Sequence, residues 1–535
     1  MLLTRLKNKD MTISDIITII SLVIAIVAII SEKNRKHLLL KFSYFDLGLY
    51  ISAFILINYF VFYNHFYSKG LYLDILYFKT FGLKNPLYYS YIISIVVLIS
   101  ILFKIWFSFY PYRKKTKVIK YYKSLIENND IPTLLDLIET YHLNDTCNYI
   151  RRSKDYNPDS EDWFNERFRR ISVKEKVINA LKRSWQNFNP YSKLNRYSYS
   201  RYILYNIIND PAFVALASND RPYFFATLIK HFKKKKRNSF PDDLTKLFLV
   251  ELIKTKNFWL IKELKLSDNF DTGQPESFFD ENKIIAALIQ DVSVAETNEI
   301  WIPFGEEAIK EIENEMNLGI DSRLNQEYRN GDILWEYKTY ISIRFFKILI
   351  IESIAQKYSG THFFLHYYWY ITDKILKNLS ANPPVDYEKK DSLYHYLINK
   401  MNDNLFHWLD LANKKESDIF HDVINCIGSQ INCLTSNPYF GEKRKIDLIE
   451  KVFRSYCHLE RNSKTDLIRD KLDIILKKPN MLTNPTDPYY TYVAKTWTSF
   501  DKAPHRGYSN SLDADYFARL KRNVIIPLNL NPNEY

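Results

Sequence analysis

Two histidines in an aromatic stretch are the first residues whose spacing could serve chemistry. His362 and His366 are four residues apart, and Asp373 follows seven residues later. On a helix this spacing places the three side chains on one face, as a two-histidine metal site requires. The second position of a catalytic H-E-x-x-H motif is occupied by Phe363, not glutamate. We therefore expect the histidines to pack and to form hydrogen bonds, with a metal site as the alternative. No cofactor is predicted.

The triplet Glu336-Tyr337-Lys338 is a second candidate for chemistry. Nucleases of the PD-(D/E)-x-K type use an acid, then an acid-x-lysine on a strand, to hold a divalent metal and activate water. The chain resembles that pattern only in these last three residues, because the upstream Asp321 and Asp332 have no proline before them. The other interpretation is a helix start with a surface ion pair. A membrane-tethered metal-dependent nuclease or other hydrolase is thus the alternative function.

Further catalytic motifs are missing from the sequence. No two of the 11 glycines lie within ten residues of each other, which excludes G-x-G-x-x-G, Walker-type and G-x-S-x-G motifs. The 4 cysteines form no C-x-x-C pair and no zinc spacing. Whether the protein is an enzyme is left open, and the missing motifs favour a non-enzymatic role.

The net charge of +13 is unevenly distributed. It is +6 over residues 1–110, +13 over 111–237 and −6 over 238–535. Basic groups beside a membrane attract anionic lipid, and basic groups interleaved with aromatic rings, as in 191–205, can hold nucleic acid. We favour anionic lipid over nucleic acid, with a solvated surface as the alternative. The candidate lipid or phosphate ligands are Arg113, Lys114, Lys115, Lys117, Lys120, Lys233, Lys234, Lys235, Lys236 and Arg237.

A run of glutamates between residues 306 and 315 is the main acidic feature. We interpret it as a solvated helix face. Docking on the basic region or binding of cations are the alternatives.

These groups must be positioned relative to three apolar stretches near the N-terminus, at about 12–31, 47–66 and 87–109. Each is long enough to cross a hydrocarbon core of about 30 Å, at roughly 1.5 Å per residue. The first lacks a small-x-small cleavage pattern, so an uncleaved anchor is favoured over a signal peptide. Lys104 is expected to snorkel, and residues 71–83 to lie in the interface. Because the span interiors offer only Asn58 and small hydroxyls, we predict an anchor, not a transport path.

Lysine and arginine in the flanks predict the orientation. The loop after the first stretch and the segment after the third carry more of them than the opposite side. We therefore expect a multi-pass protein of a bacterial inner membrane, with its N-terminus outside and its large C-terminal part in the cytoplasm.

Helical periodicity continues through the rest of the chain, so the predicted fold class is all-α. The pattern predicts helical hairpins at 124–141 and 244–266, the latter broken near 254–257, in a solenoid-like arrangement without a fixed period. Further helices are predicted at 281–292, 306–317, 338–358, 362–378, 391–412, 417–433, 444–458 and 464–477. The predicted division is a membrane anchor (1–110), a basic helical subdomain (111–270), an acidic helical subdomain (271–478) and an irregular, packed, proline-rich tail (479–535).

The layout is similar in architecture to bacterial proteins in which a short membrane anchor precedes a cytoplasmic helical sensor, including effectors of phage defence. This resemblance rests on the spans. It implies an antiviral effector of the abortive-infection type that acts on the membrane. The main expectation is a membrane-anchored sensor or interaction protein whose partner is an unknown protein or a second copy of the chain.

Overall fold

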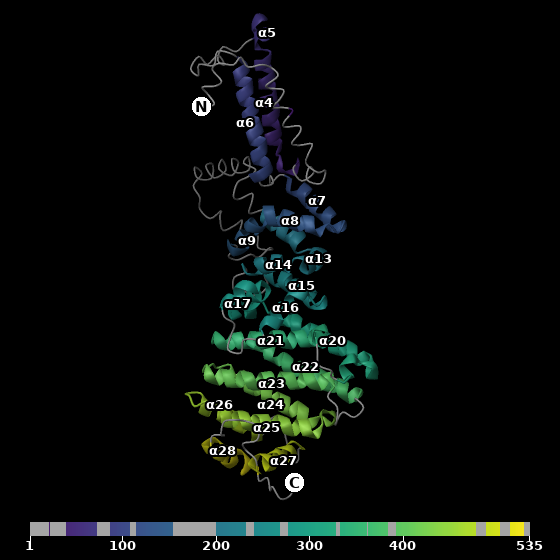
Figure 1. Ribbon diagram of the computed structural model, residues 1–535, viewed down its shortest axis with the longest axis vertical. Helices are drawn as coiled ribbons and strands as arrows, with labels where there is room; N and C mark the ends of the chain where they lie inside the picture. Colours follow the sequence, from purple (N-terminus) through teal and green to yellow (C-terminus); the bar gives the residue numbers. More distant parts are fainter. Residues whose placement is uncertain are drawn as a thin grey trace, which may run out of the picture. The chain divides into compact units, whose positions relative to one another are not determined.

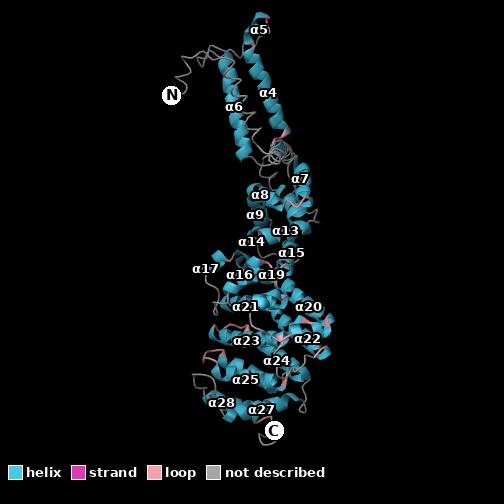
Figure 2. Cartoon of the chain, turned by 45° about the vertical axis from the view of Figure 1, so that its right-hand side comes forward, coloured by secondary structure: helices cyan, strands magenta, loops and turns pink. Residues whose placement is uncertain are grey.

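The computed structural model describes residues 21, 39–71, 86–107, 114–152, 199–231, 240–267, 276–327, 332–360, 362–383, 392–477, 488–502 and 514–528. Within these ranges every regular element is helical (Figure 2), and extended pairing is limited to one bridge between Glu327 and Ser392. The all-α prediction is therefore confirmed for the described residues. The chain forms two compact units, which divide in the sequence between Phe213 and Val214. The finer four-part division stays a prediction.

The first unit begins with a helical hairpin, in which α4 and α6 lie side by side (Figure 1). Helix α4 begins at a capping box, where Ser43 accepts from the Asp46 amide and Asp46 accepts from the Ser43 amide. This cap starts α4 three residues earlier than the predicted span and so places Asp46 inside the helix. The described helices that lie wholly in this unit are α4 (Tyr44–Val61), α5 (Tyr63–Ser68), α6 (Pro86–Phe107), α7 (Lys115–Glu127), α8 (Ile131–Tyr141), α9 (Leu143–Arg152) and a π-helix at Leu204–Ile208.

Helices α7 and α8 form the first predicted helical hairpin. The break falls at residues 128–130, where Asn129 has a left-handed φ of 53°. Pro132 lies in the first turn of α8. Asp130 occupies the N-cap position, but its side chain makes no capping hydrogen bond. The hydroxyl of Tyr122 lies 3.0 Å from Nε2 of His142, and the His142 ring stacks on Tyr199.

The second unit is a series of helices packed in successive layers (Figure 1). Alternate helices touch: α21 contacts α23, which contacts α25, which contacts α27, while α20 contacts α22, which contacts α24. This packing is consistent with stacked hairpins, and the solenoid description stays a prediction. Helix α13 (Pro211–Asp220) crosses the boundary between the units, and the helices after it are α14 (Pro222–Ile229), α15 (Phe240–Lys254), α16 (Phe258–Leu266), α17 (Glu276–Glu281), α18 (Lys283–Ile289), α19 (Val292–Thr297), α20 (Trp301–Asn317), α21 (Lys338–Ala355), α22 (His366–Ala381), α23 (Leu393–Lys414), α24 (Phe420–Ser436), α25 (Glu442–His458), α26 (Thr465–Lys477), α27 (Pro488–Lys502) and α28 (Ala514–Leu520).

Helix boundaries in this unit mostly follow the periodicity. The predicted break near 254–257 is confirmed, since α15 ends at Lys254 and Asn257 caps α16 by accepting from two backbone amides. The single helix predicted at 281–292 is wrong. That range contains the end of α17, all of α18 and the start of α19. The helix is interrupted because the chain leaves the helical conformation at Asn282 and again at Asp291.

The glutamates of α20 correct the prediction of a solvated acidic face. Glu307, Glu311 and Glu315 are 6%, 9% and 3% exposed. Glu311 accepts hydrogen bonds from the backbone amides of Lys338 and Thr339, at 3.1 and 2.8 Å, and so caps the N-terminus of α21. A carboxylate satisfies these otherwise orphaned donors and stabilises the positive end of the helix dipole. Three of the five glutamates between 306 and 315 are therefore buried between helices, whereas Glu306 and Glu313 are exposed as predicted.

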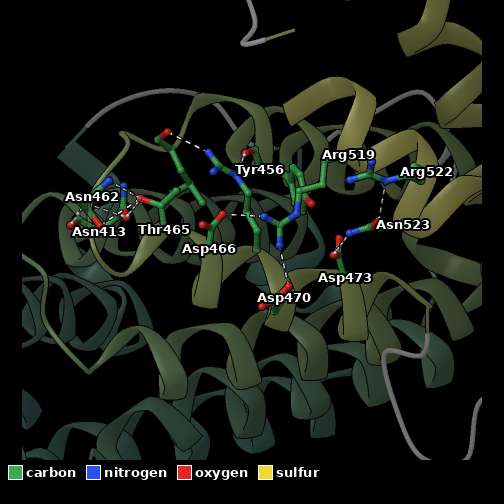
Figure 3. A network of polar contacts seen from close by, with 12 residues as sticks. Asn413, Tyr456, Asn462, Thr465, Asp466, Asp470, Asp473, Arg519, Arg522 and Asn523 are labelled. Carbon is green, nitrogen blue, oxygen red and sulfur yellow. Dashed lines mark hydrogen bonds and ion pairs between the residues drawn. The ribbon is translucent and has the colours of Figure 1, made fainter. Parts of the chain in front are cut away.

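The C-terminal tail was predicted to be irregular, and this is wrong for its described residues, most of which form α27, α28 and a π-helix at Lys521–Ile525. The predicted packing is confirmed, because Tyr489 and Trp497 are 1% and 4% exposed. Helix α28 is tied to α26 by Arg519, whose guanidinium contacts Asp466 and Asp470, both at 2.7 Å (Figure 3). Apolar burial of Leu520 and Val524 adds to this attachment, so helix formation here follows from tertiary packing.

Candidate functional site

A histidine–aspartate pair is the centre of the candidate site. His362 precedes a 3₁₀ turn (Phe363–Leu365) that leads directly into α22, and Asp422 lies in the first turn of α24. Nδ1 of His362 lies 2.7 Å from Oδ2 of Asp422. The His362 side chain is 4% exposed, and the edges of Tyr358 and Phe364 hold its ring at centroid distances of 5.6 Å. The imidazole is therefore fixed in one orientation.

The protonation of this pair follows from its geometry. The hydrogen bond from His362, with smaller contributions from His366 and His421, lowers the pKa of Asp422 below its ordinary value. Asp422 is then a carboxylate, which can only accept, so Nδ1 of His362 carries the proton. Within the described residues Nε2 of His362 is buried and has no hydrogen-bond partner. A buried polar nitrogen without a partner is unfavourable and points to a missing hydrogen-bonding group.

A pocket of about 360 Å³ surrounds the pair. Aromatic side chains from the start of α22 form one side, and polar side chains from α24 form the other. The volume lies at the lower end of the range for small-molecule sites. The lining residues are His362, Phe363, Leu365, His366, Trp369, Asp422, Asn425, Cys426 and Ser429.

The predicted two-histidine metal face does not form as the spacing suggested. His362 lies before α22 and turns to Asp422, whereas His366 is the first residue of the helix and is exposed. Asp373 is ion-paired with Lys377 at 2.7 Å and does not line the pocket. Among the described residues no group of three His, Cys, Asp or Glu side chains is placed to hold a metal ion.

The cysteines beside the pocket are structural. Cys426 donates to the carbonyl of Leu365 at 3.6 Å, and burial raises the pKa of its thiol to about 12. Cys433 accepts the indole N–H of Trp369 at 3.2 Å. A thiol that stays protonated is a poor nucleophile. Sequence analysis missed Asp422, since no local signal connects it with a histidine 60 positions away.

The nuclease-like triplet lies at a helix start, as in its second interpretation. Glu336 ends a 3₁₀ turn and is exposed, and Lys338 is the first residue of α21. The ammonium of Lys338 is paired with the buried Glu307 at 2.7 Å. In the nuclease pattern the acid and the lysine share a strand, whereas here both belong to helical backbone. The nuclease function stays a prediction.

The predicted lipid ligands are partly described. Lys117 and Lys120 are exposed on α7. Lys114 donates to the carbonyl of Leu39 at 3.0 Å, and Lys115 lies over the ring of Tyr202. Two of the predicted ligands therefore make contacts within the first unit. Arg113 and the run Lys233–Arg237 lie outside the described residues.

The hairpin of α4 and α6 contains an ion pair that the sequence did not reveal. Nζ of Lys104 lies 2.9 Å from Oδ1 of Asp46, with the two side chains only 14% and 11% exposed. Further along the same interface, the hydroxyls of Tyr50 and Ser100 are 3.1 Å apart. Lys104 therefore does not snorkel as predicted but faces α4, because a carboxylate there neutralises its charge.

The outer surface of this hairpin is apolar. Large side chains on α4 and α6 are 40–70% exposed, including Phe45, Phe54, Ile55, Val96 and Phe103. Both helices are long and apolar enough to cross a membrane, with mean hydropathies of 1.5 and 2.1. The first predicted span, at 12–31, and the interfacial segment at 71–83 fall almost entirely outside the described residues.

Comparison with known proteins adds no relative. No family model matches the chain, and no curated protein or solved structure matches it significantly.

Proposed function

We propose that this chain is a membrane-anchored helical interaction or sensor protein. The observation that carries the proposal is the inside-out hairpin of α4 and α6, which has polar and charged groups at its interface and large apolar groups outside. In water this arrangement exposes a large apolar surface at a high free-energy cost, whereas in lipid the same surface is matched by acyl chains. The hairpin therefore anchors the protein in a bilayer.

Two other features support the binding part of the proposal. The layered helices of the second unit offer long parallel surfaces of the kind that helical repeat proteins use to bind partners. Exposed Lys117 and Lys120 follow the last apolar helix closely in sequence, where they favour anionic lipid. We propose that the layered helices bind a partner protein or a second copy of the chain.

A charged substitution on the outer face of the hairpin tests the anchor. Ile55 lies on α4 and is 62% exposed, and a change of Ile55→Arg puts a charge where we place lipid. An arginine at the centre of a span raises the free energy of membrane insertion by about 2.5–3.5 kcal/mol. We expect the variant to leave the membrane pellet during alkaline carbonate extraction, while wild type resists it.

The matched control is Ile474→Arg on α26, because Ile474 is 64% exposed in the second unit. This variant should stay in the pellet. Equal extraction of the two variants, or a soluble wild-type protein, would contradict the anchor.

The effector interpretation is tested in the same cells with a potential-sensitive dye. Between Asp46 and Lys104 the two helices contain no other charged residue, so a single hairpin offers no ion path. We expect the membrane to stay polarised in the absence of a trigger. Depolarisation by the full chain, lost when residues 1–110 are deleted, would show instead that the spans act on the bilayer.

A further inference from the structure

The pocket beside His362 and Asp422 has the features of a binding site that anchoring does not require. It lies within the second unit, between the start of α22 and one face of α24. Its most buried polar group, the His362 imidazole, is 4% exposed and has an unsatisfied Nε2 within the described residues. A rigid histidine packed against aromatic rings therefore occupies a position where packing alone would favour an apolar residue.

The charge of the pocket determines what it can hold. Of the described residues, those that line it include no lysine and no arginine. Asp422 is ionised and 46% exposed, and a carboxylate that accepts one hydrogen bond keeps capacity for others. The hydroxyl of Ser429 already donates to the carbonyl of Asn425 at 3.1 Å, so its oxygen is left to accept. With one carboxylate and no lysine or arginine in its described lining, the site disfavours phosphates and carboxylates.

The walls of the pocket favour a flat apolar body. Phe363 is 52% exposed, and its ring is tilted against His366 at a centroid distance of 6.1 Å. The indole N–H of Trp369 is already bonded to Cys433, so Trp369 offers the pocket ring surface and not a donor. Aromatic rings next to a carboxylate attract cations through their quadrupole and stack on planar groups.

We propose that this pocket binds a small organic cation with a flat apolar body, such as an arylalkylamine or an aromatic amidine. The cationic N–H groups donate to Asp422, and the body packs against Phe363 and Trp369. His362 acts as a positioning residue, since its Nδ1–H fixes the carboxylate. This site gives the second unit a small-molecule ligand in addition to any protein partner.

Three probes of one shape and different charge test the proposal by calorimetric titration of the purified full-length chain. Benzamidine is the cation, benzamide its neutral counterpart and benzoate the anion. We expect benzamidine to bind, benzamide to bind at least tenfold more weakly, and benzoate not to bind. Absence of binding by benzamidine, or tighter binding of benzoate, would overturn the proposal.

Variants locate the binding. Asp422→Asn removes the charge and should weaken benzamidine binding at least tenfold, because charge-assisted hydrogen bonds are about twice as strong as neutral ones. The control is Asp418→Asn, four residues away, where the carboxylate is 65% exposed and paired with Lys464 outside the pocket. If the two variants weaken benzamidine binding equally, the effect comes from the net surface charge, and the proposed site is refuted.

A second variant covers the case in which Asp422→Asn does not fold. Phe363→Ala removes an exposed wall without a buried contact network and should weaken benzamidine binding severalfold. Unchanged affinity in a folded Phe363→Ala protein would show that the ligand lies elsewhere.

Discussion

At the scale of single residues, buried glutamates of the second unit accept hydrogen bonds from the backbone amides of segments further along the chain. Glu263 on α16 accepts from the backbone amides of Ile284 and Ile285, at 3.3 and 2.8 Å, where α18 begins. Glu311 does the same for α21, and Glu315 accepts from the backbone amide and the guanidinium of Arg323. A cap supplied by another helix fixes where the next helix starts and how it is oriented.

Glu263 gives a prediction about pH. Burial raises its pKa from 4.5 to about 7, with the two amides opposing the shift. The native state therefore binds more protons than the unfolded state between about pH 4.5 and 7. In that window the free energy of unfolding falls as pH rises. The titration of Glu263 accounts for about 3 kcal/mol of this fall.

Glu263→Gln should abolish this slope, because glutamine does not titrate. Glu263→Ala should also abolish it and cost more stability, since it leaves two buried amides without an acceptor. Urea unfolding of the three proteins at several pH values measures both effects. The control Glu313→Gln, at an exposed residue paired with Lys374, should keep the wild-type slope, and a slope retained in Glu263→Gln would contradict the assignment.

At the scale of elements, the hairpin of α4 and α6 depends on a pair of opposite charges. Removing one partner of a buried pair costs about 3–5 kcal/mol, whereas removing both costs much less. Asp46 also belongs to the cap of α4, accepting from the amide and hydroxyl of Ser43, both at 2.8 Å. An asparagine at position 46 keeps an acceptor for this cap without the charge.

We therefore expect Lys104→Met alone to lower the yield of protein that resists carbonate extraction. The double variant Lys104→Met with Asp46→Asn should recover much of it. Fluorescence-detected gel filtration of the same samples reports whether the recovered protein is monodisperse. A double variant as poor as the single one would show that the charges do not compensate each other.

At the scale of the whole molecule, the topology predicted from the sequence has three spans with the N-terminus outside. It puts Lys69, at the end of α5, outside and Lys120, on α7, in the cytoplasm. Both side chains are exposed. Three of the four native cysteines are buried and Cys433 is half-buried, so introduced thiols should dominate labelling.

In intact cells a membrane-impermeant maleimide should label Lys69→Cys and leave Lys120→Cys unlabelled until the cells are permeabilised. The wild-type protein sets the background. The reverse pattern would place the second unit outside, and labelling of both sites in intact cells would argue against a hairpin that crosses the membrane.

The helices of this protein could be predicted from local sequence alone. Helical periodicity predicted most helices of the second unit, and the break predicted near 254–257 is confirmed where Asn257 caps α16. Length and hydropathy identified the helices that became α4 and α6. These properties depend on residues a few positions apart, where propensity, capping and burial of one face act together.

The pairing of polar groups became visible only in the folded chain. Asp46 and Lys104 are 58 positions apart, Glu311 and Thr339 are 28 apart, and His362 and Asp422 are 60 apart. None of these pairs leaves a local pattern, and the sequence therefore suggested a snorkelling lysine and a solvated acidic face, and it indicated no partner for the histidine that was expected to form hydrogen bonds. A buried charge must find a partner wherever packing brings one, because leaving it unpaired costs more than almost any local preference can offset.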